Sequence, residues 1–218
     1  MPNNQVKPLS VAILAAGDFP RREPALRLMD GADMVICCDN AAQALVASGR
    51  EPSLIVGDLD SLSPDLRKRF ESRLRRFDGQ DDNDLTKAFH TALEFLPAVI
   101  HILGATGRRE DHTLGNISLL AEYQKEAPDC EIDMVSDWGR FVAVSGERTF
   151  DCVPGQEVSI FALDPALRMT AAGLKYPLDG VVFDSLWKAS LNCTTGSGFT
   201  LTPSNGSPYL VYFCRPGL

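Results

Sequence analysis

The first two thirds of the chain alternate short apolar runs, rich in β-branched residues, with amphipathic segments that have helical spacing. The expected buried strands are residues 11–16, 34–38, 54–56, 99–103 and 132–135. The expected helices are residues 41–47, 64–73, 84–95 and 114–123. Strands that alternate with helices form a mostly parallel sheet with helices on both faces, so we predict a doubly wound α/β domain.

The pattern changes from about residue 140, where short β runs are broken by Gly, Pro, Asn and Asp. These runs are residues 141–144, 149–150, 158–161, 181–183, 199–201 and 209–213. Many short strands without a helical period indicate a small antiparallel β-sandwich or barrel. We therefore predict two domains, an α/β domain over residues 1–143 and a β-sandwich domain over residues 144–218.

The charge balance limits the partners. The chain has 21 Lys and Arg against 29 Asp and Glu, a net charge of −8. A broad basic face for nucleic acid or an anionic membrane is therefore not expected. No apolar run has the length of a membrane helix, and no signal peptide is visible, so we expect a cytoplasmic protein. The six cysteines lack Cys-x-x-Cys spacing and are expected to be small buried apolar residues.

Acidic residues follow three apolar runs of the first domain, where ligands bind in open parallel sheets. They are Asp39, Asp58, Asp60, Asp81 and Asp84. Any one of them alone is explained as a helix cap or an Asx turn. Several carboxylates at one sheet edge repel each other by about 1 kcal/mol per close pair even in a wet site, and a bound cation offsets this repulsion. Oxygen ligands of this kind suit Mg²⁺.

The loop after residues 99–103 is rich in glycine and arginine. Gly104 and Gly107 let backbone N–H groups approach an anion, and Arg108 and Arg109 offer forked donors to phosphate oxygens. The alternative is a tight turn followed by solvated arginines. At the same sheet edge as an acidic metal cluster, this loop favours a metal-nucleotide polyphosphate as the ligand.

Three further side chains near these loops have open roles. Lys87 lies one turn after Asp84, either in a surface ion pair or directed at phosphate. His112 is next to Asp111 at the start of a helix, where it can donate to a phosphate or to a metal-bound water. His90 and His101 are expected to be structural, because neither is in a loop at the sheet edge.

Five segments in order carry a resemblance to a known family. They are Asp39-Asn40-Ala41-Ala42, Gly57-Asp58-Leu59-Asp60-Ser61, Asp81 to Ala88, Gly104 to Asn116, and Gly173-Leu174-Lys175-Tyr176-Pro177-Leu178. In this order and spacing the chain resembles the thiamine pyrophosphokinases over essentially its whole length. The resemblance implies a homodimer, with each site using the tail of the other subunit, that moves the terminal pyrophosphate of ATP onto the hydroxyethyl group of thiamine.

The resemblance also implies roles for individual residues. The Mg²⁺ ligands would be Asp58, Asp60 and Asp81. The catalytic residues would be Asp84, Asp60 and Lys87. ATP would be bound by Asp39, Gly104, Gly107, Arg109, Asp111, His112 and Asn116. Thiamine would be bound by Asp84, Tyr176, Trp187, Ser190 and Asn192, although Trp187 could equally be a core residue.

The chain departs from the family pattern at several positions. Gly79 and Asn83 replace an Asp and a Thr of the acidic motif, and Arg108 replaces a Gly. Leu191 separates Ser190 from Asn192, which the family tends to have as a pair. Two other functions stay open: a pyrophosphokinase for another small alcohol, such as a pterin, and a nucleotide- or thiamine-binding module without turnover.

Overall fold

The computed structural model describes residues 8–79 and 82–215, and it divides the chain into two compact units. The first unit comprises Met1–Ile117 and Glu126–Asp137, and the second comprises Ser118–Lys125 and Trp138–Leu218. The strand β7, Gly139–Val144, belongs to the second unit. The assignment of separate functions to residues 1–143 and 144–218 stays a prediction.

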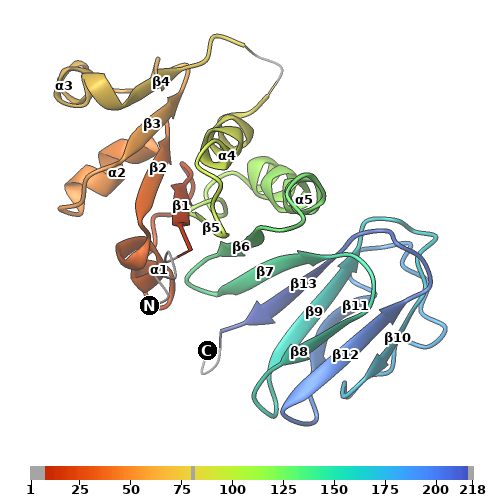
Figure 1. Ribbon diagram of the computed structural model, residues 1–218. Helices are drawn as coiled ribbons and strands as arrows, with labels where there is room; N and C mark the ends of the chain where they lie inside the picture. Colours follow the sequence, from red (N-terminus) through yellow and green to blue (C-terminus); the bar gives the residue numbers. More distant parts are fainter. Residues whose placement is uncertain (1–7, 80–81, 216–218) are drawn as a thin grey trace, which may run out of the picture. The chain divides into compact units, whose positions relative to one another are not determined.

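The first unit contains a parallel sheet with the strand order β6-β5-β1-β2-β3-β4 (Figure 1). Its strands are β1 Ser10–Leu14, β2 Met34–Cys38, β3 Leu54–Gly57, β4 Leu74–Arg76, β5 Val99–Leu103 and β6 Glu131–Val135. In register, Ile13 pairs with Ile36 on one side and with Ile102 on the other. The chain runs outward from β1 to β4 and then returns to β5, next to β1. The loops after β1 and β5 therefore lie at the point where the strand order reverses, which is where open α/β sheets bind ligands.

Helices cover both faces of this sheet, with α1 and α2 on one side and α4 on the other (Figure 1). The helices are α1 Ala25–Gly31, α2 Ala41–Ala47, α3 Pro64–Arg69, α4 Asp84–Leu93 and α5 Glu110–Glu126, with a 3₁₀ turn at Glu71–Arg73. Side chains alternate along each strand, so Ala12 and Leu14 pack with α1 and α2 while Val11 and Ile13 point to the opposite face. The predicted doubly wound α/β architecture is confirmed.

The second unit is a sandwich of antiparallel strands. One sheet has the order β11-β9-β13-β7 and the other the order β10-β12-β8. Besides β7, its strands are β8 Arg148–Asp151, β9 Glu157–Ala162, β10 Met169–Ala172, β11 Ala189–Cys193, β12 Gly198–Pro203 and β13 Tyr209–Cys214. Ile160, Leu201 and Val211 from both sheets share one buried core. The predicted antiparallel β domain is confirmed.

Some element predictions were wrong. Residues 181–183 form no strand; they follow a turn in which the Val181 N–H donates to the Leu178 carbonyl, although Phe183 is buried. The apolar run at residues 181–183 was predicted to be a strand because an apolar pattern alone does not distinguish a buried strand from a buried irregular segment. Helix α1 and the strands β10 and β11 were not predicted, and α5 is longer at both ends than expected.

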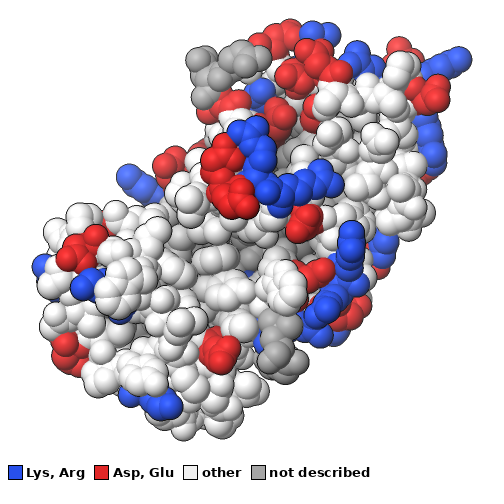
Figure 2. Space-filling view, turned by 180° about the vertical axis from the view of Figure 1, so that it is seen from behind, with Lys and Arg blue, Asp and Glu red and all other residues white. Residues whose placement is uncertain are grey.

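Three further expectations concern the cysteines, membrane-spanning helices and the distribution of surface charge. All six cysteines are free; three of them are buried as expected, and the other three are partly exposed. No helix within the described residues has the length and apolar character needed to cross a membrane. Figure 2 shows that acidic and basic side chains are interspersed on the visible face, without a field of one sign.

Candidate active site

An acidic cluster lies beyond the carboxyl ends of β2 and β3, where Asp39 and Asp84 approach Gly57. A Cβ atom added to Gly57 would be 3.0 Å from Cβ of Asp39 and 3.4 Å from Oδ1 of Asp84. Gly57 has a φ of 151°, a conformation that side chains rarely adopt. Asp39 itself has a φ of 41°, and its N–H donates to the Val56 carbonyl at 2.8 Å. The close approach of the two carboxylates therefore depends on a glycine at the end of β3.

Asp39 is buried and only partly satisfied. Its side chain is 8% exposed, and Oδ2 accepts a hydrogen bond from the hydroxyl of Ser61. Oδ1 is buried and accepts no hydrogen bond from any described residue. Burial raises the pKa of Asp39, and the charges of Asp58 and Asp84 raise it further, while Ser61 opposes the shift. A buried carboxylate oxygen without a donor next to other carboxylates is suited to a cationic ligand.

Asp58 and Asp60 lie in the loop after β3. Oδ1 of Asp58 accepts a hydrogen bond from the Asp60 N–H at 3.0 Å, which closes an Asx turn. Leu59 between them has a φ of 65° and is buried, so it anchors the loop. Asp60 is left exposed at the surface. The Asx turn occupies one oxygen of Asp58, whereas the exposed carboxylate of Asp60 accepts no hydrogen bond from the described residues and is accessible to a ligand.

Asp84 begins α4, which Asn83 caps by accepting the Thr86 N–H at 2.8 Å. The Lys87 ammonium lies 3.3 Å from Oδ1 of Asp84. Lys87 is 9% exposed, so this is not the solvated surface pair that the spacing allowed. Within the described part of the chain, Lys87 is the buried cation facing several carboxylates, so the cluster keeps a net negative charge.

The donor set fits a hard divalent cation, because it consists of carboxylate oxygens with one buried oxygen lacking a partner. Within residues 8–79 and 82–215, however, no three His, Cys, Asp or Glu side chains already stand in a metal-binding arrangement. Asp81, which the sequence also assigns to the metal, lies outside the described residues. The Mg²⁺ site therefore stays a prediction.

The glycine-rich loop after β5 is joined to the loop after β1. The Gly17 N–H donates to the Gly104 carbonyl at 2.7 Å, and the Asp18 N–H donates to the Thr106 carbonyl at 2.8 Å. A Cβ atom on Gly17 would collide with the Thr106 carbonyl, and one on Gly107 would collide with the Asp18 carboxylate. The glycines thus serve this close packing of two loops, which the sequence motif alone did not indicate.

The basic residues of this loop are held by local contacts. Arg108 has a φ of 61° and donates to the Ala16 carbonyl at 3.0 Å. Arg109 pairs with Asp111 at 2.5 Å, and both side chains are exposed. This pairing, together with the His112 N–H, lowers the pKa of Asp111 to about 2. Asn116 donates to the Ala105 carbonyl at 2.8 Å, so its amide supports the loop.

The residues of the second unit that the sequence assigns to thiamine make contacts within the chain, and their role in binding thiamine stays a prediction. Asn192 is buried, and its amide makes hydrogen bonds to both the N–H and the carbonyl of Tyr176, at 3.1 and 2.8 Å. The Ser190 hydroxyl donates to the Trp187 carbonyl at 2.8 Å. Trp187 is 67% exposed, so it is not a core residue, and Tyr176 is exposed as well. In this structure the two polar side chains therefore support the segments that present the two aromatic rings.

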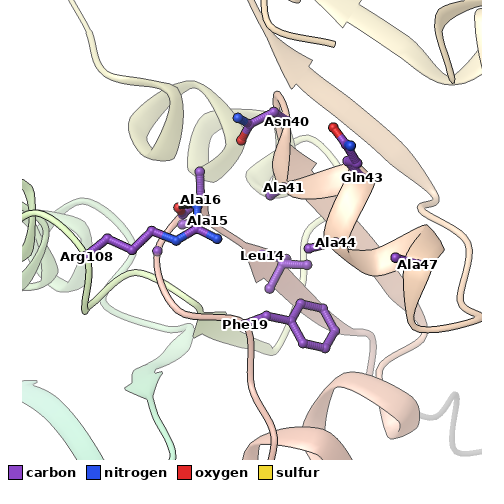
Figure 3. A pocket seen from close by; sticks show the side chains of 11 residues that line it. Leu14, Ala15, Ala16, Phe19, Asn40, Ala41, Gln43, Ala44, Ala47 and Arg108 are labelled. Atoms are coloured by element: carbon purple, nitrogen blue, oxygen red, sulfur yellow. Dashed lines mark hydrogen bonds between the residues drawn. The ribbon is translucent and has the colours of Figure 1, made fainter. Parts of the chain in front are cut away.

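A pocket of about 250 Å³ lies beside the loop after β1, and the sequence did not reveal it (Figure 3). Most of its lining residues are apolar, among them Leu14, Phe19 and alanines of α2, but polar atoms contribute as much of the lining surface as apolar atoms do. Asn40, Gln43 and Arg108 supply its polar side chains. Most of these residues belong to no recognisable sequence motif, because small apolar residues on a short helix look the same in sequence as residues of the hydrophobic core.

An α/β sheet with carboxylates and a glycine- and arginine-rich loop at its carboxyl edge is typical of enzymes that handle phosphate groups, and the comparisons place the chain among kinase-type transferases. The catalytic-domain model of thiamin pyrophosphokinase matches residues 25–132, and the substrate-binding-domain model of the same enzyme matches residues 139–212. A thiamine pyrophosphokinase of Bacillus subtilis is 30% identical over 175 residues, which are 77% of this chain and 75% of that protein. The chain belongs to the thiamine pyrophosphokinase family.

Solved structures show the same fold. The thiamin pyrophosphokinase of Geobacillus thermodenitrificans is 24% identical with a TM-score of 0.78, covering 96% of this chain and 99% of that one. The thiamin pyrophosphokinase of Candida albicans is 19% identical with a TM-score of 0.77, covering 95% and 89%. Both parts of the chain therefore have counterparts in these structures.

Proposed function

We propose that the protein transfers the pyrophosphate group of ATP to the hydroxyl of thiamine, giving thiamine diphosphate and AMP. The observation that carries the proposal is the match of both family models, the catalytic and the substrate-binding domain, to consecutive parts of one chain. The clustered Asp39, Asp84 and Lys87 beyond β2 and β3 support it, because a binding module gains little from crowded carboxylates.

In the proposed reaction the thiamine hydroxyl oxygen attacks the β-phosphorus in line. The bond between the β-phosphorus and the oxygen that bridges to the α-phosphorus breaks, and AMP leaves with that oxygen. The hydroxyl proton goes to a base or to solvent. Positioning and neutralisation of charge supply most of the rate enhancement in such reactions, without a covalent intermediate. Asp84 is assigned to orienting thiamine or to accepting this proton.

Mg²⁺ would be held by Asp58, Asp60 and Asp81. Oδ1 of Asp39, which accepts no hydrogen bond from any described residue, is a further carboxylate oxygen at this sheet edge. When bound, a divalent cation neutralises phosphate charge and orients the transferred group. Lys87 places a buried positive charge beside Asp84. We assign it to balancing the carboxylates and to attracting the polyphosphate.

The loop over residues 104–109 and the start of α5 are proposed to hold the polyphosphate. Arg109 and His112 would donate to phosphate oxygens, supported by Asp111 and Asn116 as described above. Arg109 is exposed, and its ion pair with Asp111 is a surface contact. Breaking such an ion pair in favour of a phosphate contact costs little free energy. A phosphate can therefore bind the Arg109 guanidinium in place of Asp111 without unfolding the loop.

Thiamine is proposed to contact the exposed rings of Tyr176 and Trp187, since aromatic faces attract cations. A homodimer with sites completed by the partner subunit is a separate proposal, which rests on the resemblance to the family. It is tested by mixing inactive Asp60→Asn and Trp187→Ala subunits. Recovered turnover after subunit exchange supports shared sites, and demonstrated heterodimers without turnover exclude them.

The reaction itself is tested by incubating the protein with ATP, Mg²⁺ and either thiamine or a pterin alcohol, and identifying all products. We expect AMP and thiamine diphosphate in equal amounts. ADP with thiamine monophosphate would exclude transfer from the β-phosphorus. Turnover with the pterin alcohol alone would favour the other pyrophosphokinase.

A further inference from the structure

Arg76 is the last residue of β4, and it lies at the same sheet edge as the acidic residues (Figure 1). β4 pairs in parallel with β3, so that Gly57 is the partner of Arg76, and the Phe77 N–H donates to the Gly57 carbonyl at 2.9 Å. Gly57 is followed by Asp58, and neighbouring strands are about 4.8 Å apart. Arg76 therefore stands beside the loop that carries Asp58 and Asp60, and the proposed function assigns it no role.

The Arg76 guanidinium is held by one exposed contact. Its Nε donates to Oδ1 of Asp78 at 2.7 Å, and both side chains are exposed. This hydrogen bond and the charge of Asp78 raise the pKa of Arg76, and the charges of Asp60 and Asp58 raise it further. An ion pair between two exposed side chains contributes little to stability. The guanidinium can therefore exchange Asp78 for another anion at little cost while it stays beside the carboxylates of the β3 loop.

Arg75 precedes Arg76 on the same strand and has different surroundings. Successive side chains of a strand point to opposite faces of the sheet. Leu74 packs against the core on the side of α1 and α2, so Arg76 points to this side and Arg75 to the side of α4. Arg75 is exposed, and it forms no hydrogen bond or ion pair with the residues that the structure describes. The two arginines thus carry the same charge on one edge strand, but they face different sides of it.

Positive side chains flank the carboxylates along this edge. In the strand order β5-β1-β2-β3-β4, the loop with Arg108 and Arg109 follows β5 and Arg76 ends β4. The acidic residues follow β2 and β3, between these two positions. Since β4 is next to β3, a phosphate group at the β3 loop comes within reach of Arg76, on the side opposite to the glycine-rich loop.

We propose that Arg76 binds the diphosphate portion that is transferred, by exchanging Asp78 for phosphate oxygens when the nucleotide binds. The inference rests on the proposed use of a nucleoside triphosphate as the donor. A guanidinium presents forked N–H donors that match two phosphate oxygens, and it stays charged over the whole working pH range. Before the nucleotide binds, the same side chain offsets part of the repulsion between Asp58 and Asp60.

The test compares the binding of inorganic tripolyphosphate with that of AMP, both with Mg²⁺, by titration calorimetry. Arg76→Gln should weaken tripolyphosphate binding about tenfold while changing AMP binding less than twofold, because AMP lacks the transferred groups. Arg75→Gln is the matched control, since it removes the same charge from the same strand, and it should change neither affinity more than twofold. Equal losses for the two ligands or for the two variants, or no loss in Arg76→Gln, would overturn the proposal.

Two further measurements separate phosphate binding from charge balance. Arg76→Lys keeps the charge without the forked donors, so partial recovery of tripolyphosphate affinity supports the forked contact and full recovery refutes it. If Arg76→Gln binds Mg²⁺ alone more tightly and tripolyphosphate as the wild type does, Arg76 only balances the carboxylates and the phosphate role is overturned. If tripolyphosphate affinity depends on Arg76 but the wild type forms no thiamine diphosphate, the proposed function fails and the phosphate role of Arg76 stands.

Discussion

The hydrogen bond from Ser61 to Asp39 is expected to stabilise the protein in a pH-dependent way. Ser61→Ala removes the hydroxyl from Oδ2 of a carboxylate whose other oxygen already lacks a partner. A hydrogen bond to a charged group is worth about 1.5–3 kcal/mol, and one to a neutral group about 0.5–1.5 kcal/mol. We therefore expect the variant to lose about 1.5–3 kcal/mol of unfolding free energy near pH 7.

The pH dependence follows from the sign of the pKa shift. Burial raises the pKa of Asp39 above its ordinary value of 3.8, so its ionisation opposes folding. This cost is complete above the raised pKa and disappears as the pH falls toward 3.8. Without Ser61 the pKa of Asp39 rises further and the cost grows. The difference between wild type and variant should thus be largest near neutral pH and should fall to about 0.5–1.5 kcal/mol once Asp39 is protonated.

Urea unfolding followed by circular dichroism, near pH 7 and near pH 4, measures both differences. The matched control is Ser63→Ala, because Ser63 caps α3 by accepting the Leu66 N–H and contacts no carboxylate through this bond. It should cost about 1 kcal/mol at both pH values. A Ser61→Ala loss that is equally large at both pH values, or absent near pH 7, would refute the assignment of a buried, charged Asp39 that depends on Ser61.

Three other changes test the site. Asp60→Asn should lower turnover about a hundredfold or more with an unchanged circular dichroism spectrum, and near-normal turnover at saturating Mg²⁺ would leave Asp60 only its loop role. Lys188 lies over the Trp187 ring at 4.8 Å, where it competes with a cationic ligand. Lys188→Met should therefore tighten thiamine binding about two- to fivefold by calorimetry, and unchanged binding would remove Trp187 from the thiamine site. Arg109→Gln should raise the pKa of Asp111 from about 2 toward 3.8, which NMR titration measures. In the wild type the Arg109–Asp111 pair stabilises the protein until the pH falls toward 2, and the variant lacks this contribution. An Asp111 pKa that stays near 2 would assign the shift to the backbone N–H of His112.

The sequence predicted the fold where one physical pattern was dominant. The buried strands β1, β2, β3 and β5 are nearly continuous apolar runs, as parallel strands covered on both faces must be. The short helix α1 was missed because its seven residues bury only Ala25 and Met29, too few for a visible helical period. β11 was missed because Asn192 and the exposed Leu191 interrupt its apolar pattern at an irregular pairing with β9.

The candidate site was predictable only in part, because sheet topology determines which loops meet but not which side chains make contact. Acidic residues after parallel strands must lie at one sheet edge, so the approach of Asp39 to Asp84 follows from topology. The roles of Asn116 and Asn192 as supports for loops depend on which carbonyl lies within reach, which residue spacing does not reveal. The alanines of α2 that line the pocket have no polar side chain, so nothing in the sequence marks them as part of a binding site.

The junction between the loops after β1 and β5 also affects how the binding edge moves. Gly17 and Gly104 are far apart in sequence, yet the hydrogen bonds at this junction and the lack of room for a Cβ atom at Gly17 join the two loops into one cooperative unit. Local opening of either loop must break the contacts of the other, so the amides of Gly17 and Asp18 should exchange their hydrogens together. A ligand that stabilises the loop after β5 through the Arg108 side chain would then slow hydrogen exchange at both Gly17 and Asp18 in the loop after β1.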